Sequence, residues 1–108
     1  MNRFPERDWK VLSRLKPLAL ERLSRRILDG ALEIIEDAEE GKSHDAYLAL
    51  YKFIMDQDEE VALCFDDWRR SSAMTMLICW RTRKLISDEE FAAFSPEIRN
   101  MIKLWYES

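Results

Sequence analysis

The chain has 108 residues, a length that fits one domain with one hydrophobic core. Hydrophobic residues make up 47% of it, and this apolar surface offsets the entropy lost on folding, so global disorder is excluded. The net charge of −4 weighs against non-specific binding to nucleic acid, which depends on a basic surface.

Turn-forming residues are scarce, since the chain has only two glycines and three prolines. A sandwich or barrel of short strands would need more of them. We therefore expect an all-α fold: a single domain over residues 1–108, built as a bundle of five or six helices with one or two long central helices. The N-terminal residues include no apolar segment of the secretory kind, which predicts a cytoplasmic protein with both cysteines reduced.

Prolines and glycines delimit the N-terminal helices. Pro5 suits the start of a short first helix, and Pro17 is expected to end it, because proline clashes with the carbonyl group four residues back. A long amphipathic helix is predicted to follow, with Gly41 as its C-terminal stop. Gly30 within it either allows a close helix crossing or is simply tolerated. The apolar residues of this helix are Leu20, Leu23, Ile27, Ala31, Ile34 and Ala38, with Leu28, Leu32 and Ile35 beside them.

A third helix is predicted from Ser43, a candidate N-cap, to about Met55. It has so few interior charges that we expect it to be largely enclosed. The acidic stretch 56–60 could continue this helix, but Asp58 capping a new helix is the better account. A break is therefore expected near residue 57.

The predicted fourth helix, residues 59–84, contains the stretch DDWRRSSAMTMLICW. Its ten uncharged residues from Ser71 to Trp80 are well below the roughly 20 that a membrane-spanning helix needs, so no membrane segment is expected. We interpret them as the central, enclosed helix of the bundle. On one continuous helix Cys64 and Cys79 would lie about 22 Å apart, too far for a disulfide or a shared metal.

Two capping signals predict the C-terminal helices. Ser87 with Glu90 three residues later is a capping box, which starts a short helix. Ser95 followed by Pro96 marks the start of the last helix.

Charge is segregated along the chain. Residues 1–26 hold eight basic and three acidic side chains, whereas residues 27–67 hold two basic and thirteen acidic ones, a net of −11. One interpretation is that neighbouring helices carry complementary solvated faces with local ion pairs. The other is an acidic surface that meets a basic partner or the basic surface of a second copy. The candidate residues for that surface are Glu33, Glu36, Asp37, Glu40 and Glu60.

Four tryptophans are more apolar bulk than a small monomer needs. Core positions are the ordinary interpretation, and interface anchors are the alternative. We therefore expect a regulatory or adaptor-type protein without catalytic activity, which acts through an unknown protein partner and self-associates as a homodimer. The candidate interface residues are Trp9, Trp68, Trp105 and Tyr106.

Two alternatives have weaker support. A nucleic-acid-binding regulator would use an arginine-rich surface and the helix pair of residues 87–99 as a crude helix-turn-helix, but the second helix of that pair lacks a basic face for reading bases. An enzyme would need a catalytic group, and His44 is the only imidazole, so we expect neither a di-iron site nor a cysteine nucleophile, and no cofactor. The candidate phosphate contacts are Arg22, Arg25, Arg26, Arg81 and Arg83.

Overall fold

The computed structural model describes the backbone of residues 4–107 and the side chains of residues 4–105. This part of the chain is all-α and contains no strand, which confirms the expected fold class. Its helices are α1 (Glu6–Glu36), α2 (Ser43–Val61), α3 (Ala73–Thr82), α4 (Asp88–Phe91) and α5 (Pro96–Glu107). Among them, none combines the length and the apolar character that a bilayer crossing requires.

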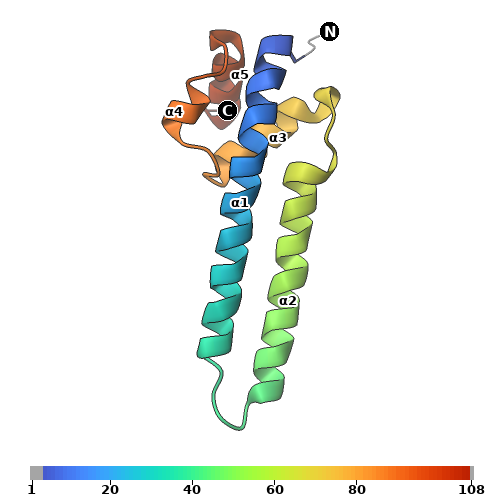
Figure 1. The fold of residues 1–108 in the computed structure, drawn as a ribbon, viewed down its shortest axis with the longest axis vertical. Coiled ribbons are helices and arrows are strands. Elements are labelled where there is room, and N and C mark those ends of the chain that lie inside the picture. Colours follow the sequence, from blue (N-terminus) through green and yellow to red (C-terminus); the bar gives the residue numbers. More distant parts are fainter. Residues whose placement is uncertain (1–3, 108) are drawn as a thin grey trace.

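The molecule consists of a head and a long arm (Figure 1). The arm is a hairpin in which the C-terminal part of α1 and α2 run antiparallel and contact each other. No residue between Leu23 and Cys64 is buried, so we call residues 24–61 the arm and the other described residues the head. The molecule measures 57 × 28 × 25 Å. Its radius of gyration of 17.1 Å exceeds the roughly 13 Å of a compact chain of this length.

α1 passes through Pro17 without a break, so the helix boundary expected there is wrong. Pro17 and Ser13, whose carbonyl group loses its helical hydrogen bond, are both exposed, and water can solvate that carbonyl. The opposite face of the helix packs into the core of the head, both before and after the proline. The buried residues that hold it are Leu12, Leu15, Ala19 and Leu23.

The turn between the two arm helices begins earlier than expected. α1 ends at Glu36, well before the expected stop at Gly41. Gly41 lies in the turn with a φ of +85°, a left-handed conformation that favours glycine. The glycine therefore serves the turn rather than the end of α1.

α2 continues through the acidic stretch 56–60, so the break expected near residue 57 is wrong. Lys52 pairs with Asp56 one turn later at 2.9 Å. The other acids of the stretch lie on exposed or half-exposed positions, where a charge costs a helix little.

α2 was also expected to be largely enclosed, and this is wrong as well. No residue of α2, all of which the structure describes, is buried. The reason is that only α1 lies alongside α2 in the described part of the chain (Figure 1). One neighbour covers one side of a helix and leaves the rest to solvent.

The fourth helix expected over residues 59–84 is divided in two. α2 passes into a π-helical turn, Ala62–Asp66, and a short 3-10 turn then leads into α3. Between these turns the Asp67 carboxylate accepts a hydrogen bond from Ser72 Oγ at 2.6 Å and pairs with Arg69 at 2.7 Å. A side chain that satisfies local donors in this way competes with the helical backbone and redirects the chain.

α3 holds most of the uncharged run and is the enclosed helix that the run predicted, with Ala73, Met76, Leu77, Cys79 and Trp80 buried. The Trp80 ring is fully buried, and its centroid lies 5.5 Å from that of Phe65 and 6.4 Å from that of Trp68. Its Nε1 donates a hydrogen bond to the Cys64 carbonyl oxygen at 3.1 Å. Trp80 therefore joins α3 to the π-helical turn.

Both capping signals near the C-terminus are confirmed. Ser87 Oγ accepts a hydrogen bond from the Glu90 backbone N–H, and the Ser87 N–H donates to Glu90 Oε1 at 2.7 Å. Ser95 precedes α5, which begins at Pro96 as expected. The carboxylate of Asp8 in α1 accepts hydrogen bonds from the Ser95 N–H and hydroxyl, so the N-terminal helix is fastened to the start of α5.

Gly30 leaves room for the Phe53 ring on the surface of α1. A Cβ atom built on Gly30 would lie 2.5 Å from Phe53 Cζ. A Gly30→Ala substitution is expected to lower the free energy of unfolding by about 1–2 kcal/mol, because displacing the ring outweighs a gain of up to about 1 kcal/mol in helix propensity. Chemical denaturation followed by circular dichroism measures the change.

The control for this prediction removes the ring first. In a Phe53→Ala background the clash is gone, so Gly30→Ala should raise the free energy of unfolding by up to about 1 kcal/mol. A stabilising effect of Gly30→Ala in the wild-type protein would contradict the contact.

Candidate interaction surface

Apolar residues cover two sides of the arm. On one side they lie between the two helices and are half-buried: Ile27, Ala31 and Ile34 of α1, and Ala46, Leu50 and Phe53 of α2. On the other side each residue keeps between 41% and 59% of its area exposed. We call these exposed residues the apolar arm face, and they are Leu28, Leu32, Ile35, Tyr47, Tyr51 and Ile54.

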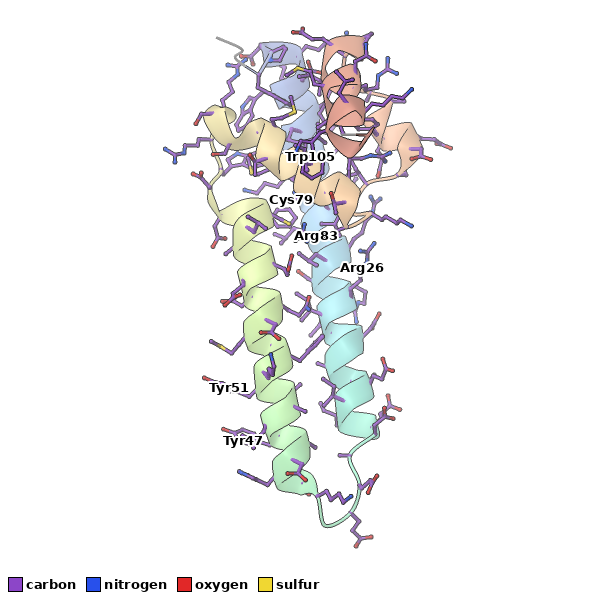
Figure 2. The ribbon with its side chains drawn as sticks, turned by 180° about the vertical axis from the view of Figure 1, so that it is seen from behind. Arg26, Tyr47, Tyr51, Cys79, Arg83 and Trp105 are labelled. Carbon is purple, nitrogen blue, oxygen red and sulfur yellow. The ribbon has the colours of Figure 1, made fainter. Side chains whose placement is uncertain are left out.

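The residues of the apolar arm face lie on one side of the hairpin. Each of them directly follows a half-buried residue in the sequence, as Leu28 follows Ile27 and Tyr51 follows Leu50. One residue corresponds to a rotation of about 100° around the helix axis. Because α1 and α2 run antiparallel, this rotation turns both sets toward the same side. Figure 2 shows Tyr47 and Tyr51 on the half of α2 that is distant from the head.

The apolar arm face is a patch rather than a set of scattered residues. At about half exposure each, its side chains present on the order of 600 Å², the upper end for the largest patch of a typical monomer. One partner contributes roughly 800 Å² to a standard protein interface. Leu48 and Met55, both exposed, extend the patch along the outer edge of α2.

Most of the candidate acidic residues lie at the distal end of the arm and are exposed. We call Glu33, Glu36, Asp37, Glu39 and Glu40 the acidic tip. Lys42 pairs with Glu39 there at 3.3 Å and offsets one of these charges. Glu60, the remaining candidate, lies at the base of the arm instead, where it forms an ion pair with Arg83.

The structure places the candidate interface aromatic residues in two different settings. Trp9 and Trp68 are half-buried in the head, with ring centroids 4.8 Å apart and Lys16 Nζ 4.1 Å from the Trp68 ring. Trp105, by contrast, keeps 54% of its area exposed on α5. The side chain of Tyr106 lies outside the described residues.

The five arginines considered as phosphate contacts all have partners within the chain. Arg25 pairs with Asp29 at 3.8 Å on the exposed surface of α1. The others lie where the arm meets the head, and Figure 2 shows Arg26 and Arg83 in this region. Their partners are Glu90 and the Leu85 carbonyl for Arg22, the Arg83 and Lys84 carbonyls for Arg26, Asp88 for Arg81, and Glu60 for Arg83.

The pair of Arg22 and Glu90 is bidentate, with N–O distances of 2.7 and 2.9 Å. Hydrogen bonds from Arg22 and from the Ser87 backbone N–H lower the pKa of Glu90 to about 2, from 4.5. The stability that Glu90 contributes is therefore fully present above pH 4.5 and is lost as the pH falls toward 2. Glu90→Gln should lower the free energy of unfolding at pH 7 by about 1–3 kcal/mol, and the difference from wild type should shrink below pH 4.5.

Denaturant titrations at neutral and acid pH test this prediction. Glu89→Gln is the matched control, because Glu89 is an exposed neighbour for which the same substitution removes the same charge. A difference between Glu90→Gln and wild type that stayed constant down to pH 2 would rule out the proposed role of the carboxylate.

The division of the expected fourth helix brings the two cysteines together. Both are free, buried thiols of the head. α3, which holds Cys79, packs against the π-helical turn, which holds Cys64, so the wide separation expected on a continuous helix is wrong. Burial, and the neighbouring Cys79 thiol next, raise the pKa of Cys64 to about 12. His44 lies at the start of α2, exposed, with its ring 5.9 Å from that of Tyr47. Among the described residues, no His, Cys, Asp and Glu side chains are grouped so as to hold a metal ion.

Sequence reasoning missed the apolar arm face, although a signal for it was present. Leu28, Leu32 and Ile35 lie beside the main apolar series of the long helix and make its apolar side wider than one neighbouring helix covers. The same is true of Tyr47 and Tyr51 in α2. Comparison of the chain with models of known families, with curated proteins and with solved structures found no significant match.

Proposed function

We propose that the protein acts by binding a protein partner through the apolar arm face, as a regulatory or adaptor protein without catalytic activity. The observation that carries this proposal is an apolar side left uncovered on a hairpin one layer thick. Amphipathic helices gain stability when their apolar side is covered, and helical domains achieve this with a second layer. In the described part of the chain the arm has no second layer, and a partner surface would supply it.

The charges of the arm favour a protein partner over nucleic acid. The acidic tip would repel phosphate groups along the distal part of the arm. Arg26 and Arg83 hold the arm to the head, and Arg22 and Arg81 make contacts within the head, so recruiting these arginines to phosphates would cost those contacts. An apolar patch beside acidic residues is the composition of a protein interface with a polar rim.

Affinity capture with a matched pair of variants tests the proposal. Leu32→Gln combined with Tyr51→Gln places two amides on the apolar arm face, while Lys52→Gln places one at an exposed position beside it on α2. The tagged wild-type protein and Lys52→Gln should retain the same proteins from an extract of the source cells. The double variant should lose them, because its surface can no longer exclude water from the interface.

Nuclease treatment of the extract separates this proposal from its alternative. Retention that is unaffected by nuclease and lost in the double variant is the expected result. Retention that nuclease abolishes, and that the double variant keeps, would overturn the proposal and favour nucleic-acid binding by the arginines. Circular dichroism of each variant confirms that the helices are intact.

A further inference from the structure

We infer that a second copy of this chain covers the apolar arm face, with the two arms face to face and antiparallel. The inference rests on the proposed function and names its partner. Two hairpins that meet through their apolar sides form a four-helix bundle, the common way in which paired helices build a core. A second copy offers a hairpin of the same length, with its apolar residues at the same spacing.

The area of the apolar arm face agrees with a dimer. Two copies would bury on the order of 1,200 Å² in total, which exceeds the roughly 1,000 Å² expected of a specific interface. Leu48 and Met55 at the outer edge of α2 can enlarge it. The interface would also be rich in tyrosine, a residue enriched in such contacts.

Charge along α1 favours the antiparallel orientation. If the two arms ran parallel, the acidic tips of both copies would lie side by side, and like charges would repel each other. In the antiparallel arrangement each acidic tip lies instead beside the base of the other arm. On α1 the base carries Arg25, which is 62% exposed, and Arg26, which donates to backbone carbonyls, whereas on α2 it carries the acidic stretch 56–60.

The register of the hairpin shows which residues would meet. Phe53 lies over Gly30, so Tyr51 of α2 is at about the level of Leu32 in α1. A two-fold axis at that level lays the apolar arm face of one copy on the same face of the other. It also brings His44 to the level of Asp58 of the other copy, and the acidic tip toward the end of the other arm that carries Arg25. His44 and Asp58 can form a hydrogen bond, and the acidic tip and Arg25 carry opposite charges.

The shape of the molecule accommodates this arrangement. The acidic tip and the head lie at opposite ends of the apolar arm face (Figure 1). Antiparallel arms therefore place the two heads at opposite ends of the four-helix bundle, where they do not collide. The elongated form of one chain, 57 Å long, becomes one half of a longer two-fold assembly.

Sedimentation equilibrium over a range of micromolar concentrations tests whether the partner is a second copy. We expect a species of twice the 12.9 kDa chain mass for wild type and for Lys52→Gln. Leu32→Gln combined with Tyr51→Gln should raise the dimer dissociation constant by at least about 100-fold, because both residues lie at the centre of the interface. Tyr51→Phe keeps the ring and should leave the dissociation constant nearly unchanged.

Cross-linking tests the orientation. A cysteine introduced as Lys52→Cys lies next to Tyr51, near the two-fold axis of an antiparallel dimer and outside the apolar arm face, so a short bis-maleimide should join the two chains. Glu40→Cys, in the acidic tip, should give no such product, because the tips lie at opposite ends. The native cysteines are buried, and the unsubstituted protein is the control for them. Cross-linking of Glu40→Cys alone would overturn the antiparallel orientation.

The outcomes separate this inference from the proposed function. A protein that stays monomeric at all concentrations overturns the inference, yet if capture from extract still depends on the apolar arm face, the proposed function stands. If the monomeric wild-type protein also captures no partner through the apolar arm face, both the inference and the proposed function fail. A dimer that persists in the folded double variant would show that the copies meet elsewhere, and the inference would be wrong.

Discussion

Trp80→Ala is expected to lower the free energy of unfolding by about 3–5 kcal/mol, the range for truncating a large buried aromatic residue. The Trp80 ring is fully buried, and it stacks against Phe65 and Trp68. The substitution would leave a cavity between α3 and the π-helical turn, because the surrounding residues relax only partly into the space of a removed ring. Because domains have a total stability of only about 5–15 kcal/mol, the head of this variant should be marginally folded at 25 °C. Urea denaturation followed by circular dichroism measures the effect.

Trp80→Phe separates the packing of the ring from its hydrogen bond. Phenylalanine keeps most of the apolar contact but cannot donate to the Cys64 carbonyl oxygen, so we expect a loss of about 1–3 kcal/mol. Leu104→Ala, at a side chain that is 68% exposed on α5, should change the stability by no more than about 0.5 kcal/mol. If Trp80→Ala were no less stable than Leu104→Ala, α3 would not be the centre of the head.

Local chemistry allowed several elements to be predicted from the sequence. The capping box of Ser87 and Glu90 formed as expected, and so did the start of α5 at Ser95 and Pro96. These signals depend on hydrogen bonds within three residues, and distant parts of the chain change them little. The all-α class follows from composition for a similar reason, since a lack of turn residues limits every strand-rich alternative.

Elements whose outcome depends on tertiary contacts were predicted less well. Pro17 and the acidic stretch 56–60 were expected to break helices, and neither does. In both places the unfavourable groups face water, while other sides of the helix are held by neighbours. The chain turns at Asp67 instead, where a carboxylate finds the Ser72 hydroxyl and Arg69 as partners. Sequence periodicity does not reveal these partners.

The candidate interaction surface illustrates a further limit. Periodicity shows which apolar residues share a side of a helix, and it placed Tyr51 and Ile54 in a largely apolar helix correctly. It does not show how many neighbours that helix has. An apolar circumference was therefore interpreted as enclosure for both Ser71–Trp80 and residues 43–55. The first interpretation agrees with the structure because α3 lies within the head, and the second fails because α2 lies in the arm.

Asp8→Ala is expected to lower the free energy of unfolding by about 2–4 kcal/mol, because it removes two charge-assisted hydrogen bonds at a fully buried site. The Asp8 carboxylate accepts from the Ser95 N–H at 2.7 Å and from the Ser95 hydroxyl at 2.8 Å. It lies in the first turn of α1 and beside the start of α5, so two helix N-termini stabilise its negative charge. This explains how a buried carboxylate is accommodated here.

A double-mutant cycle distinguishes this link from a general sensitivity of the head. Asp8→Ala leaves the Ser95 N–H without its acceptor, whereas Ser95→Ala removes only the hydroxyl and should cost about 1–2 kcal/mol. The two effects should be coupled by at least about 1 kcal/mol, because both substitutions act on one pair of hydrogen bonds. Asp8→Asn keeps one oxygen acceptor for the Ser95 N–H and should lose less than Asp8→Ala. Purely additive effects in denaturant titrations would mean that Asp8 and Ser95 do not hold α1 to α5.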